Sequence, residues 1–210
     1  MDSTDAADLI AEVAEETSAS AGADRFRNRA ALLIATLAAV LAIGGMGGGN
    51  ATDDMISSNI AASNTWGFFQ AKNIRQTIYE LAVEDIETAL LAETDPVVRR
   101  QLEESRSEHL STITRYDSDP DPAAPGDPLR GEGKAQLSAR AAHLEAQFEQ
   151  ASRRDNNFDL AEVCLQLALV LGSVAILAMN RPTLYGSAAL GAVGTLLTLN
   201  GFLLLVPLPG

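Results

Sequence analysis

One short segment gathers the side chains best suited to binding a ligand or a partner. Its candidate contact residues are Trp66, Phe69, Lys72, Arg75 and Gln76. On a helix, Lys72, Arg75 and Gln76 can share one face because they lie three and four residues apart. Such a face could clamp an anion or a lipid headgroup, and the aromatic side chains could grip a partner. A packing cluster where two helical arms meet is the alternative, and the residue types leave this choice open.

Glu162 is the other residue with a possible chemical role, because it is the one acidic residue inside a long apolar run. Ionisable groups within a membrane are costly to bury and are therefore functional candidates. Glu162 could contact an ion or a proton in a transport or channel component. It also lies near the start of the run, where its carboxylate could reach the polar interface instead.

Patterns typical of catalysis or metal binding are missing from the sequence. His109 and His143 are isolated, no Glu-x-x-His pairing is present, and no Cys/His cluster suits zinc. The nucleophile-elbow pattern Gly-x-Ser-x-Gly does not occur. The glycine run 44–49 lacks the Gly-Lys-Ser/Thr of a phosphate loop. We therefore expect a protein that is not an enzyme and needs no metal or cofactor.

The elements that would position these residues are dominated by three long apolar runs. They cover residues 30–48, 160–179 and 183–206. About 20 helical residues cross a hydrocarbon core of about 30 Å, and the runs lack the alternation of a barrel strand. The sequence predicts an all-α protein with three transmembrane helices. Small residues at four-residue steps would let these helices approach closely, and they are Ala31, Ala35, Ala39, Gly44, Gly48, Ser187, Gly191 and Thr195.

Charge is distributed unevenly around these runs. Residues 50–158 carry nineteen acidic and eleven basic residues, and the whole chain has a net charge of −13. An acidic insert argues against nucleic acid as a partner. Arginines 25, 27 and 29 precede the first run, and Arg181 lies in the short turn between the last two. By the positive-inside rule we expect a multi-pass membrane protein with a cytoplasmic N-terminus and an extracytoplasmic insert.

The insert reads as a helical hairpin. A helix over 56–92 is predicted, and Asp95-Pro96 ends it before a second helix over 97–115. The proline-rich loop 117–133 is predicted to be disordered, as is the acidic tail 1–24. The apolar face predicted for the helix over 56–92 consists of Ala71, Ile74, Ile78, Ala82, Ile86 and Ala89.

A return helix over 134–179 has the most regular pattern in the chain. Its four-three spacing gives a period of about 3.5 residues, which is typical of left-handed coiled-coil packing. The positions are Leu137, Ala141, Leu144, Phe148, Ala151, Asp155, Phe158, Glu162, Leu165, Leu169, Gly172, Ile176 and Met179. The return helix should pair with the helix over 56–92. This hairpin offers few bulky apolar side chains, so we expect self-association to support it.

The residues also resemble a known family. Asn28-Arg29-Ala30, the segment from Trp66 to Gln76 and the final pair of apolar runs are similar to the bacterial membrane family known as domain of unknown function 4337. The resemblance covers nearly the whole chain and implies this fold and a location in the bacterial inner (cytoplasmic) membrane, with no activity attached. We therefore expect a scaffold or accessory subunit that contacts membrane lipid and associates with itself or with another membrane protein. A transport component using Glu162 is the alternative.

Overall fold

The computed structural model describes the backbone of residues 3–207 and the side chains of residues 22–207. The described residues form four helices, which are α1 (Ser3–Ala92), α2 (Pro96–Asp117), α3 (Lys134–Ala178) and α4 (Arg181–Leu203). Within this described part no β-strand forms, so the predicted all-α class is confirmed. The chain divides into two compact units. We call Asp54–Gln150 the polar unit, and the segments up to Asp53 and from Ala151 the apolar unit.

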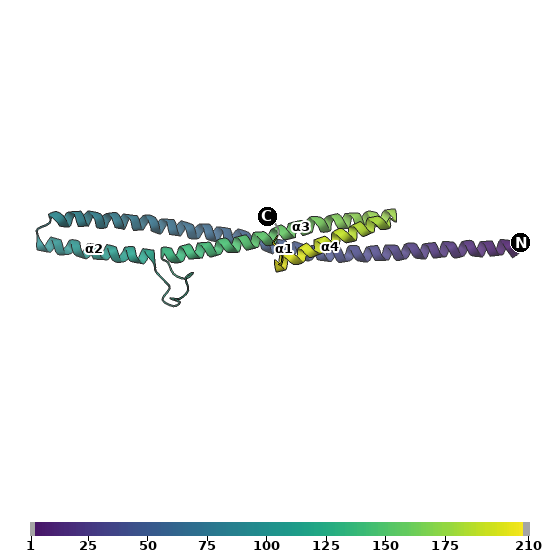
Figure 1. The fold of residues 1–210 in the computed structure, drawn as a ribbon, viewed down its shortest axis with the longest axis horizontal. Helices are drawn as coiled ribbons and strands as arrows, with labels where there is room; N and C mark the ends of the chain where they lie inside the picture. The colour runs from purple at the N-terminus through teal and green to yellow at the C-terminus, as the bar shows by residue number, and fades with distance from the viewer. Residues whose placement is uncertain (1–2, 208–210) are drawn as a thin grey trace. The chain divides into compact units, whose positions relative to one another are not determined.

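The first helix is longer than the sequence predicts. α1 runs from Ser3 to Ala92, so the predicted first span and the helix over 56–92 belong to one element (Figure 1). The tail 1–24 was expected to be disordered, whereas the backbone is helical from Ser3, and residues 1 and 2 lie outside the described part. Alanine and glutamate are frequent in this tail and favour helix, so the segment can extend a helix already nucleated by the apolar run.

Among its described residues, the apolar unit contains three helical stretches long and apolar enough to cross a membrane, one each from α1, α3 and α4. Glycines lie at close contacts between these helices. A Cβ atom added to Gly47 would lie 2.6 Å from the ring of Phe158, and one added to Gly201 would lie 2.7 Å from the same ring. Small residues at such crossings allow close contact between helix backbones. The buried core cluster consists of Leu37, Leu165 and Ala168.

The predicted small-residue faces are found on α4 but only in part on α1. Ser187 and Gly191 are buried in α4, with Thr195 half-buried beside them. In α1, Gly44 is buried and Gly48 is half-buried, whereas Ala31, Ala35 and Ala39 are exposed. The buried side of α1 passes through Leu37. Positions two residues away lie on the opposite side of a helix, which is why the neighbouring alanines face outward.

The second and third apolar runs each end in a turn, the second at residues 179–180 and the third after Leu203. Met179 adopts a positive φ of 51°, and the Asn180 side chain caps α4 by accepting from the Thr183 N–H at 3.5 Å. The third run, predicted to extend to residue 206, ends as a helix at Leu203. Pro207 disfavours a helical conformation at the preceding Val206. The Asn200 side chain instead binds both backbone groups of Val206, each at 2.9 Å.

In the polar unit, α1 runs antiparallel to α2 and then to the first part of α3 (Figure 1). The contacts follow this order, from Glu87 with Arg106 at 2.6 Å to Trp66 with Glu145 at 2.7 Å. The predicted break before α2 is confirmed, because the Asp95 side chain accepts from the Val97 N–H at 2.8 Å and caps the new helix.

The buried side of α1 in the polar unit is not the predicted one. Ile74 and Ile78 are 62% and 59% exposed, Ala71 and Ala89 are exposed, and only Ala82 and Ile86 are half-buried. The opposite side of the helix is buried, and its residues are small or polar: Ser58, Ala62, Thr65, Gln76 and Val83. The prediction placed the bulkiest side chains at the contact between helices. In the structure the smaller side chains are buried there, because they let antiparallel helices pack closely.

The predicted seam of α3 holds through the polar unit and the start of the apolar unit, and then shifts. Leu137 and Ala141 are buried in the polar unit, and Phe158 is buried in the apolar unit. Glu162 is exposed, and Ala161 is buried in its place. The buried side then continues through Leu165, Ala168, Gly172 and Ala175. At Ala161 the backbone of α3 lies close to α4, since a Cβ atom added to Gly194 would be only 3.1 Å from the Ala161 backbone oxygen. A small residue at position 161 allows this close contact. Left-handed supercoiling of the helices stays a prediction.

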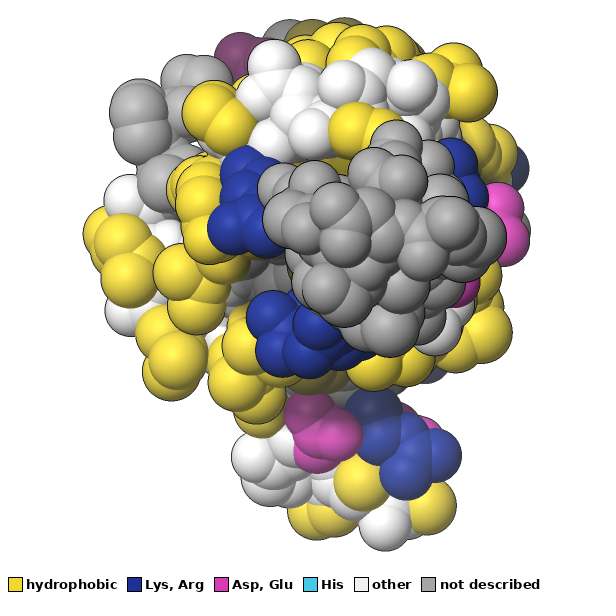
Figure 2. All heavy atoms as spheres, turned by 90° about the vertical axis from the view of Figure 1, so that its right-hand side faces the viewer, with side chains coloured by type: hydrophobic (Ala, Val, Ile, Leu, Met, Phe, Trp, Pro, Cys, Tyr) yellow, Lys and Arg dark blue, Asp and Glu magenta, His cyan; other side chains and the backbone are white. Residues whose placement is uncertain are grey.

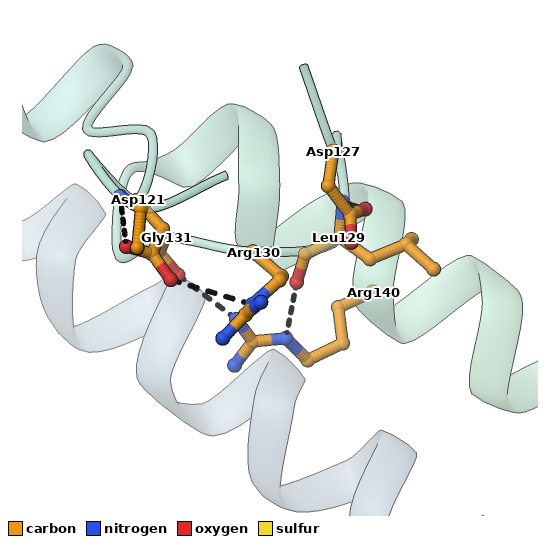
Figure 3. A network of polar contacts seen from close by, with 7 residues as sticks. Asp121, Asp127, Leu129, Arg130, Gly131 and Arg140 are labelled. Carbon is orange, nitrogen blue, oxygen red and sulfur yellow. Dashed lines mark hydrogen bonds and ion pairs between the residues drawn. The ribbon is translucent and has the colours of Figure 1, made fainter. Parts of the chain in front are cut away.

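The loop between α2 and α3 has a defined path, although its composition predicts disorder. Pro120 and Gly131 form an isolated antiparallel bridge. Arg140 of α3 donates from Nε to the Leu129 carbonyl and from Nη2 to the Gly131 carbonyl, both at 2.9 Å (Figure 3). Gly131 has a φ of 125°, and a Cβ atom there would overlap the Asp119 carbonyl oxygen. One arginine and one glycine thus organise a segment that composition alone describes as flexible.

Candidate functional site

The two aromatic candidates are held within the polar unit. The half-buried Trp66 donates from Nε1 to Glu145 Oε1 of α3 at 2.7 Å. Its ring also meets Phe69 edge-to-face, with the ring centres 5.4 Å apart. Sequence reasoning missed Glu145, because this partner lies 79 residues away along the chain. The Trp66 side chain therefore links α1 to α3, and Phe69 packs against Trp66 on the same helix.

Two of the polar candidates lie at the point where α2 ends and α3 begins. The Lys72 ammonium is 3.7 Å from the Glu132 carboxylate and 5.6 Å from the centre of the Tyr116 ring. Gln76 is only 6% exposed and donates from Nε2 to Asp117 Oδ1 at 3.2 Å. These carboxylates already neutralise the basic group and would repel an anion, so they weigh against a clamp at this point.

Arg75 is separated from these two residues. It is exposed and forms no hydrogen bond or ion pair within the described part of the chain. The three polar side chains predicted to share a face therefore do not converge on one point. The contacts of Lys72 and Gln76 support the packing interpretation, and Arg75 alone remains available to a partner.

Gln76 also carries an unusual feature, since its Oε1 atom is buried without a hydrogen-bond partner. A buried acceptor without a partner costs about 1–3 kcal/mol relative to one that is satisfied. The Nε2 atom has two acidic acceptors, Glu80 at 2.9 Å and Asp117 at 3.2 Å. This orientation is fixed by those carboxylates, because the reversed amide would turn its oxygen toward them.

Glu162 lies on the outward side of α3, away from the buried seam. Its Oε1 atom accepts from Gln166 Nε2 one turn later, at 2.7 Å. The neighbouring Leu160 and Val163 are 51% and 55% exposed. An ion contact at Glu162 would therefore need further groups supplied from outside the apolar unit.

A second regular surface of α1 emerges from the structure, and we call it the outer stripe. It consists of Ile60, Asn64, Gly67, Ala71, Ile74, Ile78 and Leu81. All seven are exposed, and they recur at strict four-three steps. The outer stripe lies on the side of the helix opposite the buried residues and carries no charged residue. The apolar face predicted from the sequence shares Ala71, Ile74 and Ile78 with this stripe, but the prediction placed that face in contacts within the chain.

The histidines have structural neighbours. His109 packs edge-to-face on Tyr79 with ring centres 5.2 Å apart, and His143 lies 3.2 Å from the side chain of Gln147. Within the described residues, no three or more histidine, cysteine or acidic side chains gather as a metal site would require.

Comparison with known proteins gives one assignment. No curated protein and no solved structure matches the chain significantly. One family, described as Domain of unknown function (DUF4337), matches residues 26–204. This range includes the three apolar stretches, the candidate residues from Trp66 to Gln76 and the outer stripe. Because the match covers most of the sequence, the chain belongs to the family described as Domain of unknown function (DUF4337).

Proposed function

We propose that this protein is a non-enzymatic membrane scaffold or accessory subunit that associates with a second copy of itself through the outer stripe. Its apolar helices turn large aliphatic side chains outward, including Leu32 at 71%, Val170 at 60% and Leu177 at 86% exposure. Large exposed apolar surfaces are unfavourable in water and indicate contact with lipid or protein. A lipid bilayer would cover the exposed aliphatic side chains of all three helices together.

The orientation that we propose follows from the arginines at one end of the apolar helices. Three of them precede the apolar part of α1, and Arg181 begins α4. Basic residues favour the cytoplasmic side. The N-terminus would then be cytoplasmic and the polar unit extracytoplasmic, in a cytoplasmic membrane.

The exposure and regular spacing of the outer stripe are the main support for self-association. Copies anchored in one membrane share a direction, so their α1 helices can align in parallel and in register. Each residue of the outer stripe would then meet its own counterpart, which creates layers of isoleucine from Ile60, Ile74 and Ile78. Asn64 would meet Asn64 of the second copy, and a single polar layer of this kind fixes the register of a parallel pair.

Charge does not oppose this pairing. In a parallel pair of heptad helices, Arg75 at one edge of the stripe would face the neutral Gln70 of the second copy. The stripe itself contains no charge between Ile60 and Leu81. The four-three steps also correspond to a period of about 3.5 residues, so the paired helices would supercoil with a left hand.

Disulfide cross-linking in native membranes tests this proposal. In a Cys164→Ser background, mild oxidation of Ile78→Cys should give covalent dimers because each residue would face itself. Asn59→Cys is the matched control, since Asn59 is exposed on the same helix but lies outside the outer stripe and its edges. Equal dimer yields from both variants would contradict pairing through the stripe. Linkage of Ile78→Cys to a different protein would instead identify a membrane-protein partner.

A transport or channel component is the second candidate function. It is supported by the Glu162–Gln166 pair on the outward side of an apolar helix, where a neighbouring copy could complete a polar path. Ion or proton flux in liposomes should then depend on the Glu162 carboxylate. A flux that is absent, or that is unchanged by Glu162→Gln, would eliminate this candidate.

A further inference from the structure

The apolar unit contains a hollow between the starts of the apolar stretches of α1 and α4. Its volume is about 410 Å³. Figure 2 faces this end of α1 and shows basic side chains gathered beside hydrophobic ones. The lining residues are Gly22, Arg25, Phe26, Arg29, Arg181, Leu184 and Tyr185.

The lining has a pronounced chemical bias. Among the residues whose side chains the structure describes, it includes three guanidinium groups and one phenol and no acidic side chain. Guanidinium groups bind phosphate oxygens with paired, charge-assisted hydrogen bonds. The first turn of α4 begins at Arg181, and the positive end of its helix dipole adds to the same field. The hollow is therefore suited to a phosphate-bearing anion.

The surroundings of the hollow favour a ligand that also has an apolar part. Phe26 and Leu184 line it directly. The first apolar run begins at Ala30, one residue after Arg29, and the third begins at residue 183, two residues after Arg181. A helix rises about 1.5 Å per residue, so both runs start within a few ångströms of the arginines. A phosphate bound here would lie at the boundary where lipid headgroups meet acyl chains.

We propose that this hollow binds the phosphodiester headgroup of an anionic phospholipid. Arg29 of α1 would hold it from one side and Arg181 of α4 from the other, with Tyr185 able to donate from its hydroxyl. The acyl chains would extend along the apolar helices. This inference rests on the membrane insertion proposed above, but it assigns these arginines a specific ligand beyond their contribution to orientation.

Native mass spectrometry of the full-length protein tests the site. Protein would be released from nanodiscs of phosphatidylcholine containing phosphatidylglycerol as the probe lipid. The wild type should retain phosphatidylglycerol, and Arg29→Gln/Arg181→Gln should retain about tenfold less. Arg27→Gln is the matched control, because Arg27 lies in the same basic segment but does not line the hollow. It should retain phosphatidylglycerol like the wild type.

A second double variant, Arg29→Lys/Arg181→Lys, keeps the charge that orients the helices but loses the paired geometry of guanidinium. Weaker retention of phosphatidylglycerol by this variant would support the site even if the glutamine variant inserted poorly. An equal loss in Arg27→Gln, or no preference of the wild type for phosphatidylglycerol, would overturn it. Saturable binding of inorganic phosphate in phosphatidylcholine-only nanodiscs would also overturn it, by showing a soluble ligand.

The outcome can be separated from that of the proposed function. Alkaline carbonate extraction reports whether the protein is inserted in the membrane at all, independently of any bound lipid. A protein that resists extraction but shows no selective lipid retention would refute the lipid site and leave the scaffold proposal standing.

Discussion

Truncation of Ile78 to alanine gives the sharpest test of the outer stripe, because this side chain contributes little within one chain. It is 59% exposed, so about three fifths of its burial energy is available only on association. Complete burial of such a side chain contributes about 2–3 kcal/mol. Allowing for the methyl group that alanine retains, Ile78→Ala should remove about 1–1.5 kcal/mol per copy.

A symmetric pair contains this side chain twice, so the variant should weaken association by about 2–3 kcal/mol. At about 1.4 kcal/mol per tenfold change, the dissociation constant should rise by about 30- to 140-fold. Energy transfer between donor- and acceptor-labelled full-length protein, measured in liposomes over a range of protein-to-lipid ratios, reports this shift directly.

The control for this experiment is Leu91→Ala. Leu91 is 89% exposed on the same helix but lies outside the outer stripe, so its truncation should leave association unchanged. At dilutions where neither protein associates, thermal unfolding of Ile78→Ala should match the wild type, because alanine has the higher helix propensity and few internal contacts are lost. If Ile78→Ala shifts association no more than Leu91→Ala, the stripe is not the interface.

Three further predictions follow from close contacts and a buried polar atom. Gly201→Leu should lower the melting temperature in detergent, because overpacking against the Phe158 ring costs about 1–3 kcal/mol; Gly186→Leu, where a Cβ atom meets nothing within 4 Å, should not. Gly131→Ala should make the loop after α2 more sensitive to limited proteolysis, since its φ is 125°, and unchanged cleavage relative to the unconstrained Gly126→Ala would contradict the described loop path. Gln76→Leu should raise the melting temperature by removing a buried unpaired acceptor worth about 1–3 kcal/mol; a lower value would show that its two hydrogen bonds to carboxylates matter more.

Several features were predictable because their causes are local. The break at Asp95-Pro96 follows from the side-chain cap and from a proline suited to the first helical turn. The helix over 134–179 agrees closely with α3 because no residue in it forbids helix. Phe158 was predicted in a seam and is 4% exposed, although the glycines that receive its ring come from α1 and α4.

Other features escaped prediction because they depend on partners far along the chain. Trp66 and Gln76 were recognised as a cluster, but Glu145 and Asp117 could not be chosen among the many acidic residues. The loop after α2 looked disordered because composition does not reveal that Arg140 binds two of its carbonyl groups.

An all-α chain with three helices apolar enough to cross a membrane is predictable from the residues alone, because helix periodicity and apolar length are properties of continuous segments. Which side of each helix faces inward depends instead on the neighbouring helices of the folded chain. Ile74 and Ile78 mark an apolar side of α1, yet the smaller residues opposite them are the buried ones. Two helices that pack closely select for small side chains at their contact, and that selection depends on the geometry of the neighbouring helix.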